Sequence, residues 1–410
     1  MDLVLQNARL DHGRPADPID VGIANGKIAL VAPHIDSGSP ALDLDGRLLS
    51  PGLVETHVHL DKSRIMDRCR SEEGTLAEAI REVAQAKRAF TVEDVYRRAS
   101  RTLEAAIVHG VTHLRTHVEV DPSIGTRGLE AMLQLKGDYA WAVDLELVAF
   151  PQEGLISNPG TDALILEAMD RGARVVGGAP YVDSDPHGQI DRVFEIARRY
   201  DADVDLHLDF FLDPERMDVE YVCRMTDRHQ YAGRVNVGHV SALSTLDPEA
   251  LDRLARRIAG AGVAVTVLPS TDLFLMGSGA THNVPRGTAP AHRLVERGVN
   301  CSLSTNNVLN PFTPFGDSSL LRMANLYANI AQLGRARELA ECFEMITRRS
   351  ARILGLERHM VELGAAADLV ILDAPDRASA VAELATPLYG FKRGRMTFRR
   401  EPARLLRPEA

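Results

Sequence analysis

Between residues 50 and 305, short apolar runs rich in β-branched residues alternate with longer segments in which apolar residues recur every three or four positions. The first pattern is typical of buried strands and the second of amphipathic helices. The apolar runs lie at residues 48–59, 111–120, 143–150, 174–180, 203–209, 234–240, 263–269 and 299–305. Helical segments between them include residues 75–90, 161–172, 191–200 and 251–262.

Eight strand–helix repeats predict an α/β fold of the (β/α)8 TIM-barrel type, with a doubly wound open sheet as the alternative. The barrel is favoured because open sheets seldom need eight consecutive parallel strands. Residues near both ends of the chain indicate short strands joined by turns instead. We therefore predict a small β domain built from residues 1–50 and 356–410, flanking a barrel of residues 51–355. Two separate β appendages are the alternative.

The composition excludes several classes of protein. A hydrophobic content of 45% and a charged content of 25% are ordinary for a soluble globular protein. A net charge of −10 argues against nucleic acid or an anionic membrane as the main partner. No secretory signal and no uninterrupted apolar segment of about 18 residues is visible. The cysteines have no short spacings, so we expect reduced thiols in a cytoplasmic protein; they are Cys69, Cys223, Cys301 and Cys342.

Histidines follow several of the predicted strands, and in a barrel the carboxyl ends of the strands meet at one mouth. His57 and His59 are two residues apart on a strand, so both side chains point to the same face. An isolated pair of this kind is more often structural. His207 and His239 close the fifth and sixth runs, and their convergence with the pair favours a zinc- or iron-like site. We predict that the following histidines are structural or solvated: His12, His34, His109, His113, His187, His229 and His359.

The chain resembles the amidohydrolase superfamily and, within it, the cytosine deaminase-like branch that includes the isopropylammelide hydrolases. The motifs that carry the resemblance are "SPGLVETHVHLDK", "LRTHVEVD", "LVAFPQEG", "DVDLHLD", "GHVSALS", "STNNVLNPFTPFG" and "GAAADLVILD". The resemblance implies one divalent metal ion, zinc or iron, held by His57, His59 and His207. It also implies that His239 contacts the substrate or the attacking water, and that the protein is a homo-oligomer.

Two residues depart from what the resemblance implies. Asn306 occupies the position of an aspartate that ligates the metal and takes a proton, and Phe210 replaces a glutamate that shuttles the proton. An asparagine offers neither negative charge nor a basic site, so the occupancy of the metal site is left open. Asp209 is predicted to substitute in proton transfer, because it follows His207 by two residues and shares its face if the strand continues. Asp272 lacks the strand-end geometry expected of a metal ligand.

Further side chains near the predicted mouth are assigned to the substrate. The resemblance implies that Gln152 contacts a substrate ring, and a loop glutamine paired to the backbone is an equal alternative. The wall made by Phe210 and Phe211 predicts an apolar portion on the ligand, such as an N-alkyl group. The remaining candidates for substrate contact are Lys62, His117, Asn307 and Phe312.

The sequence thus predicts a metal-dependent hydrolase that cleaves a C–N bond in a small nitrogen-rich, cyclic or N-substituted molecule. The loss of the glutamate argues against cytosine itself. Two alternatives remain open at this point: an enzyme of the same fold with altered or metal-free chemistry, and a non-catalytic binding protein. The histidines argue against the last, since a decayed site would more often lose several ligands.

Overall fold

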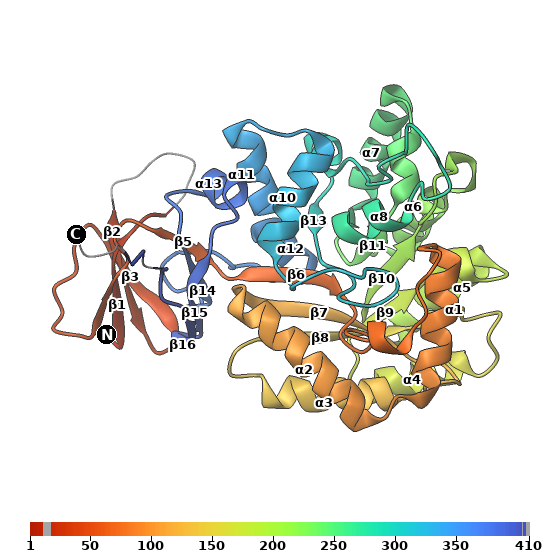
Figure 1. Cartoon of the computed structure of the whole chain (residues 1–410), viewed down its shortest axis with the longest axis horizontal. Coiled ribbons are helices and arrows are strands. Elements are labelled where there is room, and N and C mark those ends of the chain that lie inside the picture. The colour runs from red at the N-terminus through yellow and green to blue at the C-terminus, as the bar shows by residue number, and fades with distance from the viewer. Residues whose placement is uncertain (11–17, 404, 407–410) are drawn as a thin grey trace.

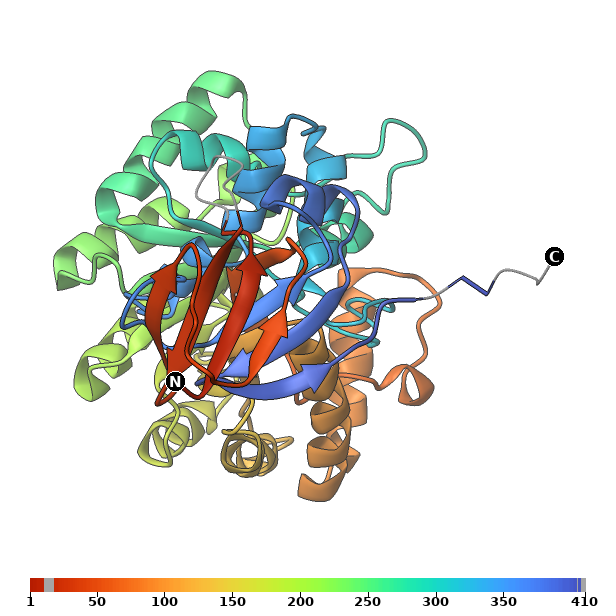
Figure 2. The same ribbon diagram turned by 90° about the vertical axis from the view of Figure 1, so that its left-hand side faces the viewer.

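A computed structural model describes residues 1–10, 18–403 and 405–406, so His12 lies outside the described residues. Figure 1 shows a small β domain at the left and a barrel surrounded by helices at the right. Figure 2 shows the same β domain from its outer side, in front of the barrel. The arrangement agrees with the predicted fold class, a TIM-type barrel with a small β domain formed from both parts of the chain.

Within the described residues, eight parallel strands form the barrel sheet in the order β6 to β13. The main chain of Asn306, just after β13, closes the ring: His59 N–H donates to its oxygen (2.8 Å), and its own N–H donates to His57 O (2.9 Å). The strands are β6 (Leu53–Val58), β7 (Val111–Glu119), β8 (Asp144–Phe150), β9 (Val175–Gly178), β10 (Asp203–Leu208), β11 (Val235–His239), β12 (Val263–Val267) and β13 (Cys301–Leu303).

Helices cover the outside of the barrel and bury one face each against it (Figure 1). Their first turns are capped by side chains such as Thr75 and Thr91, which accept the backbone N–H three residues later. The helices are α1 (Leu76–Ala86), α2 (Val92–Val108), α3 (Arg127–Asp138), α4 (Thr161–Asp170), α5 (Pro186–Tyr200), α6 (Val219–His229), α7 (Pro248–Ala261), α8 (Pro269–Leu275), α9 (Ala291–Glu296), α10 (Leu320–Ala331), α11 (Ala336–Glu344), α12 (Arg348–Ile353) and α13 (Arg377–Ala382).

The small domain consists of two sheets that share one hydrophobic core. Leu5 and Ile23 from the first sheet pack in the same cluster as Leu49, Leu369 and Phe391 from the second, so one core unites both parts of the chain. The first sheet contains β1 (Leu3–Ala8), β2 (Ile19–Ala24), β3 (Lys27–Ala32) and β4 (Ala41–Asp43). The second contains β5 (Leu48–Pro51), β14 (Leu369–Leu372), β15 (Pro387–Lys392) and β16 (Arg395–Arg399).

The apolar run at residues 48–59, which reads as one strand in the sequence, is two strands in the structure. Its first part is β5 in the small domain and its second part is β6 in the barrel. The chain passes between them at Gly52, where an added Cβ would lie only 2.2 Å from Thr112 Oγ1. A glycine is required there because β7 packs directly against the backbone.

His359 lies buried at this junction, with its Nε2 2.6 Å from Gly52 O. Burial lowers its pKa to about 4. In the unfolded chain this imidazole has a pKa of about 6.5, so it binds a proton at a higher pH than in the folded protein. At pH 5 this difference lowers the free energy of unfolding by about 2 kcal/mol. His359→Gln retains an N–H donor but does not titrate. Urea unfolding at pH 7.5 and pH 5 should therefore show a smaller acid loss in the variant, and equal losses would contradict this.

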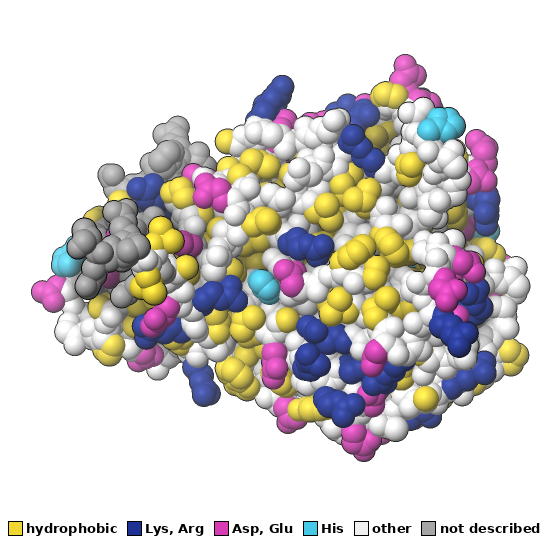
Figure 3. All heavy atoms as spheres, in the orientation of Figure 1, with side chains coloured by type: hydrophobic (Ala, Val, Ile, Leu, Met, Phe, Trp, Pro, Cys, Tyr) yellow, Lys and Arg dark blue, Asp and Glu magenta, His cyan; other side chains and the backbone are white. Residues whose placement is uncertain are grey.

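The surface is ordinary for a globular protein. Figure 3 shows acidic and basic side chains interspersed over the visible face. In the part of the chain that the structure describes, no helix is both long and apolar enough to cross a membrane. Each of the four cysteines of the sequence is a free thiol.

Candidate active site

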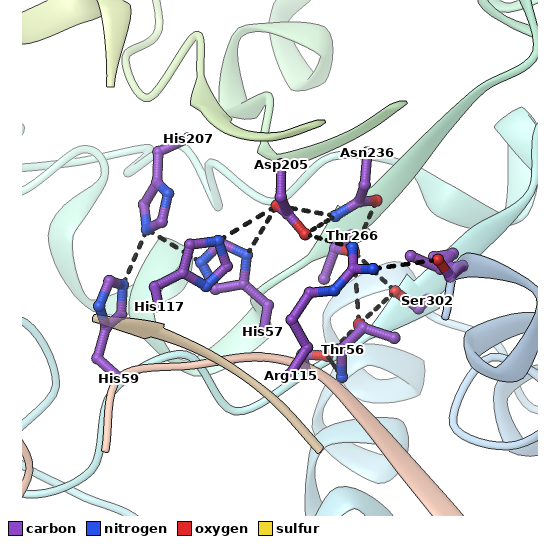
Figure 4. Close-up of polar contacts among 12 residues, drawn as sticks. Thr56, His57, His59, Arg115, His117, Asp205, His207, Asn236, Thr266 and Ser302 are labelled. Atoms are coloured by element: carbon purple, nitrogen blue, oxygen red, sulfur yellow. Dashed lines mark hydrogen bonds and ion pairs between the residues drawn. The ribbon is translucent and has the colours of Figure 1, made fainter. Parts of the chain in front are cut away.

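Histidines from four barrel strands gather at the carboxyl ends of the sheet. Figure 4 shows the rings of β6, β7 and β10 pointing toward one another. All are almost fully buried, whereas histidines in general are of intermediate burial. They are His57, His59, His117, His207 and His239.

Two ring nitrogens lie close to the Nε2 atom of His207. His207 Nε2 lies 3.0 Å from His57 Nε2 and 2.9 Å from His59 Nε2. Burial is the main cause that lowers the pKa of all three rings well below the usual value, so each is a neutral imidazole. Nitrogen ligands of a tetrahedral ion at about 2.0–2.1 Å lie about 3.3 Å apart. Both separations from His207 Nε2 are therefore compatible with ligands that share a divalent metal ion, and the three nitrogens cannot all be satisfied by donating to one another.

Other groupings of the same rings are also compact enough to hold a metal ion. The ring nitrogens of His57, His207 and His239 lie within 4.8 Å of one another, as do those of His57, His59 and His117. His117 packs on His57 with its ring centroid 3.9 Å away. The histidine cluster thus offers more nitrogen ligands than one ion needs.

A buried carboxylate supports this cluster from the barrel interior (Figure 4). Asp205 Oδ1 lies 3.3 Å from His117 Nε2 and 3.7 Å from His57 Nδ1. Arg115 Nη1 donates to Asp205 Oδ2 (3.0 Å), and Asn236 Nδ2 lies 3.1 Å from both carboxylate oxygens. Neither ring nitrogen is hydrogen-bonded within the described residues, so Asp205 acts on these rings through its charge.

Hydroxyl groups inside the barrel extend the hydrogen-bonded network of Asp205 and Asn236. Thr266 Oγ1 donates to Asn236 Oδ1 (3.0 Å) and lies 2.8 Å from Ser302 Oγ, which in turn lies 2.8 Å from Thr56 Oγ1. Barrel interiors are usually filled with branched apolar residues. Here a connected hydrogen-bonded layer holds the histidine-bearing strands in one arrangement.

His239 is fixed separately from the other rings. Its Nδ1 lies 2.7 Å from Asp272 Oδ1 on α8, and its ring stacks on Phe210 with a centroid distance of 3.8 Å. Both His239 and Val240 have positive φ (69° and 44°), so the chain turns sharply at the end of β11. At Gly238 an added Cβ would lie 2.8 Å from His57 Cε1. Only glycine at this position therefore leaves room for the His57 ring.

A small cavity of about 10 Å³, roughly the space of one water molecule, lies beside the histidines. Most of its lining residues were assigned to the site from the sequence, and Tyr181, at the end of the fourth predicted strand, lies in the short turn η3 (Pro180–Val182). His57 and His117 do not line it. The lining residues are His59, Lys62, Gln152, Tyr181, His207, Phe210, His239, Asn306, Asn307 and Phe312.

Asp209, the predicted proton carrier, does not line this cavity. Its carboxylate accepts the backbone N–H groups of Asp218 and Val219 at 2.8 and 3.2 Å, where α6 begins. The prediction assumed that the strand continues, but β10 ends at Leu208 and Asp209 has φ 48°. The alternation of faces stops at that residue, so Asp209 is directed to the helix instead.

Asn306 lies just after β13, at the end of the eighth barrel strand, as the sequence predicted. Its side chain is 1% exposed, and its Oδ1 has no hydrogen-bond partner among the described residues. An unpaired buried oxygen facing a cavity is costly unless a ligand or ion fills the space.

Lys62 belongs to a buried ionic network at the cavity wall. Its ammonium donates to Glu119 Oε1 (2.8 Å) and to Gln152 Oε1 (2.6 Å). Glu119 Oε2 accepts from Lys87 Nζ (2.9 Å), which also pairs with other carboxylates. Those carboxylates are Asp121 and Glu153.

Asp205, Arg115 and Asp272 were not recognised in the sequence as parts of a site. The sequence does contain a signal for the first two. Asp205 stands two residues before His207, and Arg115 two residues before His117, so each shares the inner face of its strand with that histidine. No comparable signal marks Asp272, which lies on the short helix α8.

Comparisons with known proteins agree with this arrangement. Residues 41–398 match the model of the "Amidohydrolase family". The chain is 28% identical to N-isopropylammelide isopropyl amidohydrolase of Pseudomonas sp. (strain ADP) over 98% of each chain. The structure of 5-methylcytosine deaminase from Klebsiella pneumoniae, liganded with 5-fluorocytosine, superposes with a TM-score of 0.94 at 29% identity over 99% of each chain.

A second solved structure is similar over nearly the whole length. N-isopropylammelide isopropylaminohydrolase from Burkholderia multivorans superposes with a TM-score of 0.85 at 28% identity, over 97% of this chain and 98% of that one. The family match covers most of the chain, and the relatives span both of its domains. The chain therefore belongs to the amidohydrolase family of hydrolases, in its cytosine deaminase-like branch.

Proposed function

We propose that this protein is a metal-dependent hydrolase that cleaves a C–N bond in a small, nitrogen-rich cyclic molecule. The observation that carries the proposal is the convergence of three neutral imidazole nitrogens beside a small cavity. Relatives named as an amidohydrolase and a deaminase support the reaction class.

His57, His59 and His207 would hold one divalent ion, zinc or iron. When bound, such an ion lowers the pKa of water and polarises the carbon under attack. Phe210 and Phe312 both line the cavity, and their rings favour a flat substrate with an apolar portion.

We assign proton transfer to His239, oriented by Asp272. Because the Asp272 carboxylate accepts the Nδ1–H, the Nε2 of His239 is left as an acceptor on the cavity side. It takes a proton from the attacking water and returns it to the departing nitrogen. This assignment replaces the role predicted for Asp209, whose carboxylate is engaged by α6.

The proposal is tested by amine or ammonia release from a panel of amino- and N-alkylamino-substituted diazines and triazines. Turnover is expected to follow metal content, to stop when a chelator removes the metal, and to return when metal is added back. A fully metal-loaded protein that releases nothing from the panel, or a metal-free protein that retains its turnover, would contradict the proposal.

Asn306→Asp is expected to tighten metal binding by about tenfold or more, because it adds a negative charge beside the histidines. The side chain already lies at the strand end beside them. Competition with a chromophoric chelator measures the change. Asn329→Asp, on the exposed side of α10, adds the same charge far from the site and should leave the affinity unchanged. Equal affinity in all three proteins would mean that residue 306 does not face the metal.

A further inference from the structure

The barrel sheet is joined at one place without a regular ladder of hydrogen bonds. β6 and β13 are the two ends of the eight-stranded sheet, and an isolated bridge between Val58 and Asn306 connects them. We call this junction of β6 with residues 301–306 the seam. His57 and His59 stand on one side of it, and Asn306 stands on the other. Whatever holds the seam therefore sets the relative positions of groups that face the proposed metal centre.

The strand that carries His57 is bulged at the seam. Glu55 is paired with Leu114 of β7. The next pair is Val58 with Thr116, so β6 advances three residues while β7 advances two. Such a bulge takes backbone N–H groups out of the ladder and redirects side chains, as bulges beside active sites commonly do. The direction of the His57 ring therefore depends on what holds this bulge in place.

Glu55 holds the bulge and the opposite side of the seam at the same time. Its side chain is 2% exposed. Its Oε1 accepts the backbone N–H of His57 at 3.1 Å. Its Oε2 accepts the backbone N–H and the hydroxyl hydrogen of Thr305 at 3.2 and 2.7 Å. One carboxylate thus ties His57 to the residue that precedes Asn306.

Thr56 makes the neighbouring connection across the seam. Its N–H donates to Ser304 Oγ at 3.2 Å. Its Oγ1 lies 2.7 Å from the same oxygen and 2.8 Å from Ser302 Oγ, in the hydroxyl layer of Figure 4. A hydroxyl group can turn, and it can either donate or accept. An ionised carboxylate only accepts, so Glu55 fixes the direction of each of its donors.

We propose that Glu55 is a positioning residue of the metal centre. It fixes the bulge that carries His57 against Thr305, and it thereby sets the separation of His57 and Asn306 across the seam. The inference rests on the proposed function for the identity of the metal centre. It adds a residue that does not line the cavity and acts through the ligands.

Two positions test the role, and a third provides the control. In Glu55→Gln the amide keeps one accepting oxygen but turns an N–H₂ group toward donors. Thr305→Val removes the hydroxyl donor at the same shape, and Thr305→Ser keeps it. Asp20→Asn is the matched control, because Asp20 is 3% exposed and accepts the backbone N–H groups of Asn7 and Ile35 in the small β domain.

Cobalt(II) is the probe of the centre, because its visible absorption depends on the arrangement of its ligands. Competition with a chromophoric chelator measures its affinity. Glu55→Gln is expected to weaken cobalt binding by about 10- to 100-fold and to change the spectrum. Thr305→Val should show a smaller effect in the same direction. Thr305→Ser and Asp20→Asn should keep the native affinity and spectrum.

Two results with cobalt overturn the inference. The first is a folded Glu55→Gln protein with native affinity and spectrum, and the second is an equal change in Asp20→Asn. If Glu55→Gln does not fold, the two variants of Thr305 decide, and equal behaviour of Thr305→Val and Thr305→Ser overturns the inference.

Hydrogen exchange followed by mass spectrometry reads the seam in protein from which a chelator has removed the metal. Peptides that span residues 53–60 and 302–309 should exchange about tenfold or more faster in Glu55→Gln than in the unsubstituted protein. The peptides of the other barrel strands should keep their rates. Unchanged exchange at the seam, or equal acceleration throughout the barrel, overturns the inference.

These readouts separate the inference from the proposed function. An unsubstituted protein that binds no cobalt contradicts the proposed function, and hydrogen exchange then decides whether Glu55 holds the seam. A protein that binds cobalt, responds to Glu55→Gln and releases no amine contradicts only the hydrolase. Amine release together with a seam that ignores Glu55→Gln contradicts only the inference.

Discussion

His207→Asn is expected to abolish tight metal binding and to lower turnover by at least about 10³-fold. His207 is the ring whose Nε2 lies within 3.0 Å of both other proposed ligands, so its loss leaves two nitrogens that no longer enclose an ion. Two ligands hold a divalent ion far less tightly than the three protein ligands typical of catalytic sites.

Elemental analysis after dialysis and steady-state turnover measure the two effects together. His282→Asn, in an exposed loop segment, is the matched control and should keep both metal and activity. Circular dichroism checks that the fold survives. A folded His207→Asn protein that retains one equivalent of metal would show that a different set of the clustered histidines binds it.

Asp272→Asn is expected to lower kcat by about 10³- to 10⁴-fold while the metal content stays unchanged. The carboxylate of Asp272 selects the ring tautomer in which His239 Nδ1 carries the hydrogen. An asparagine that presents its N–H group reverses the tautomer and places a hydrogen on Nε2, which then cannot accept a proton. The corresponding change in a serine protease triad costs about 10⁴-fold.

The pH profile of kcat distinguishes a positioning role from a merely structural one. Asp272→Asn should change the shape of the profile, whereas a merely structural loss would lower it uniformly. Asp209→Asn is the informative comparison, because asparagine also caps a helix and the carboxylate lies at the start of α6. We expect less than about a tenfold loss there. A larger loss in Asp209→Asn than in Asp272→Asn would return the proton-transfer role to Asp209.

The sequence predicted the barrel well because each strand is a continuous apolar run with polar residues at its end. It did not separate the two strands that lie within the run at residues 48–59. Apolar residues are buried on both sides of Gly52: Leu48 and Leu49 in β5 and Leu53 and Val54 in β6. Periodicity cannot separate two strands that are both buried, and the pair Pro51–Gly52 is the local mark of the change.

The site was predictable where strand geometry holds and unpredictable where it ends. Two-residue spacing correctly grouped His57 with His59, and the same spacing extends inward to Asp205 and Arg115. It failed at Asp209, where a positive φ ends the alternation. Contacts made across the barrel by short helices and turns, such as the one between Asp272 and His239, depend on tertiary packing and leave no periodic trace.

The closure of the barrel limits what can replace residue 306. Its peptide group joins the last strand to the first, and its φ of 58° lies in the left-handed region that asparagine and aspartate tolerate better than most residues. The main chain at residue 306 makes the hydrogen bonds that close the barrel whether the side chain is asparagine or aspartate. Exchange between them can therefore change the charge at the catalytic mouth without opening the ring, so this point of the fold lets chemistry diverge while architecture is preserved.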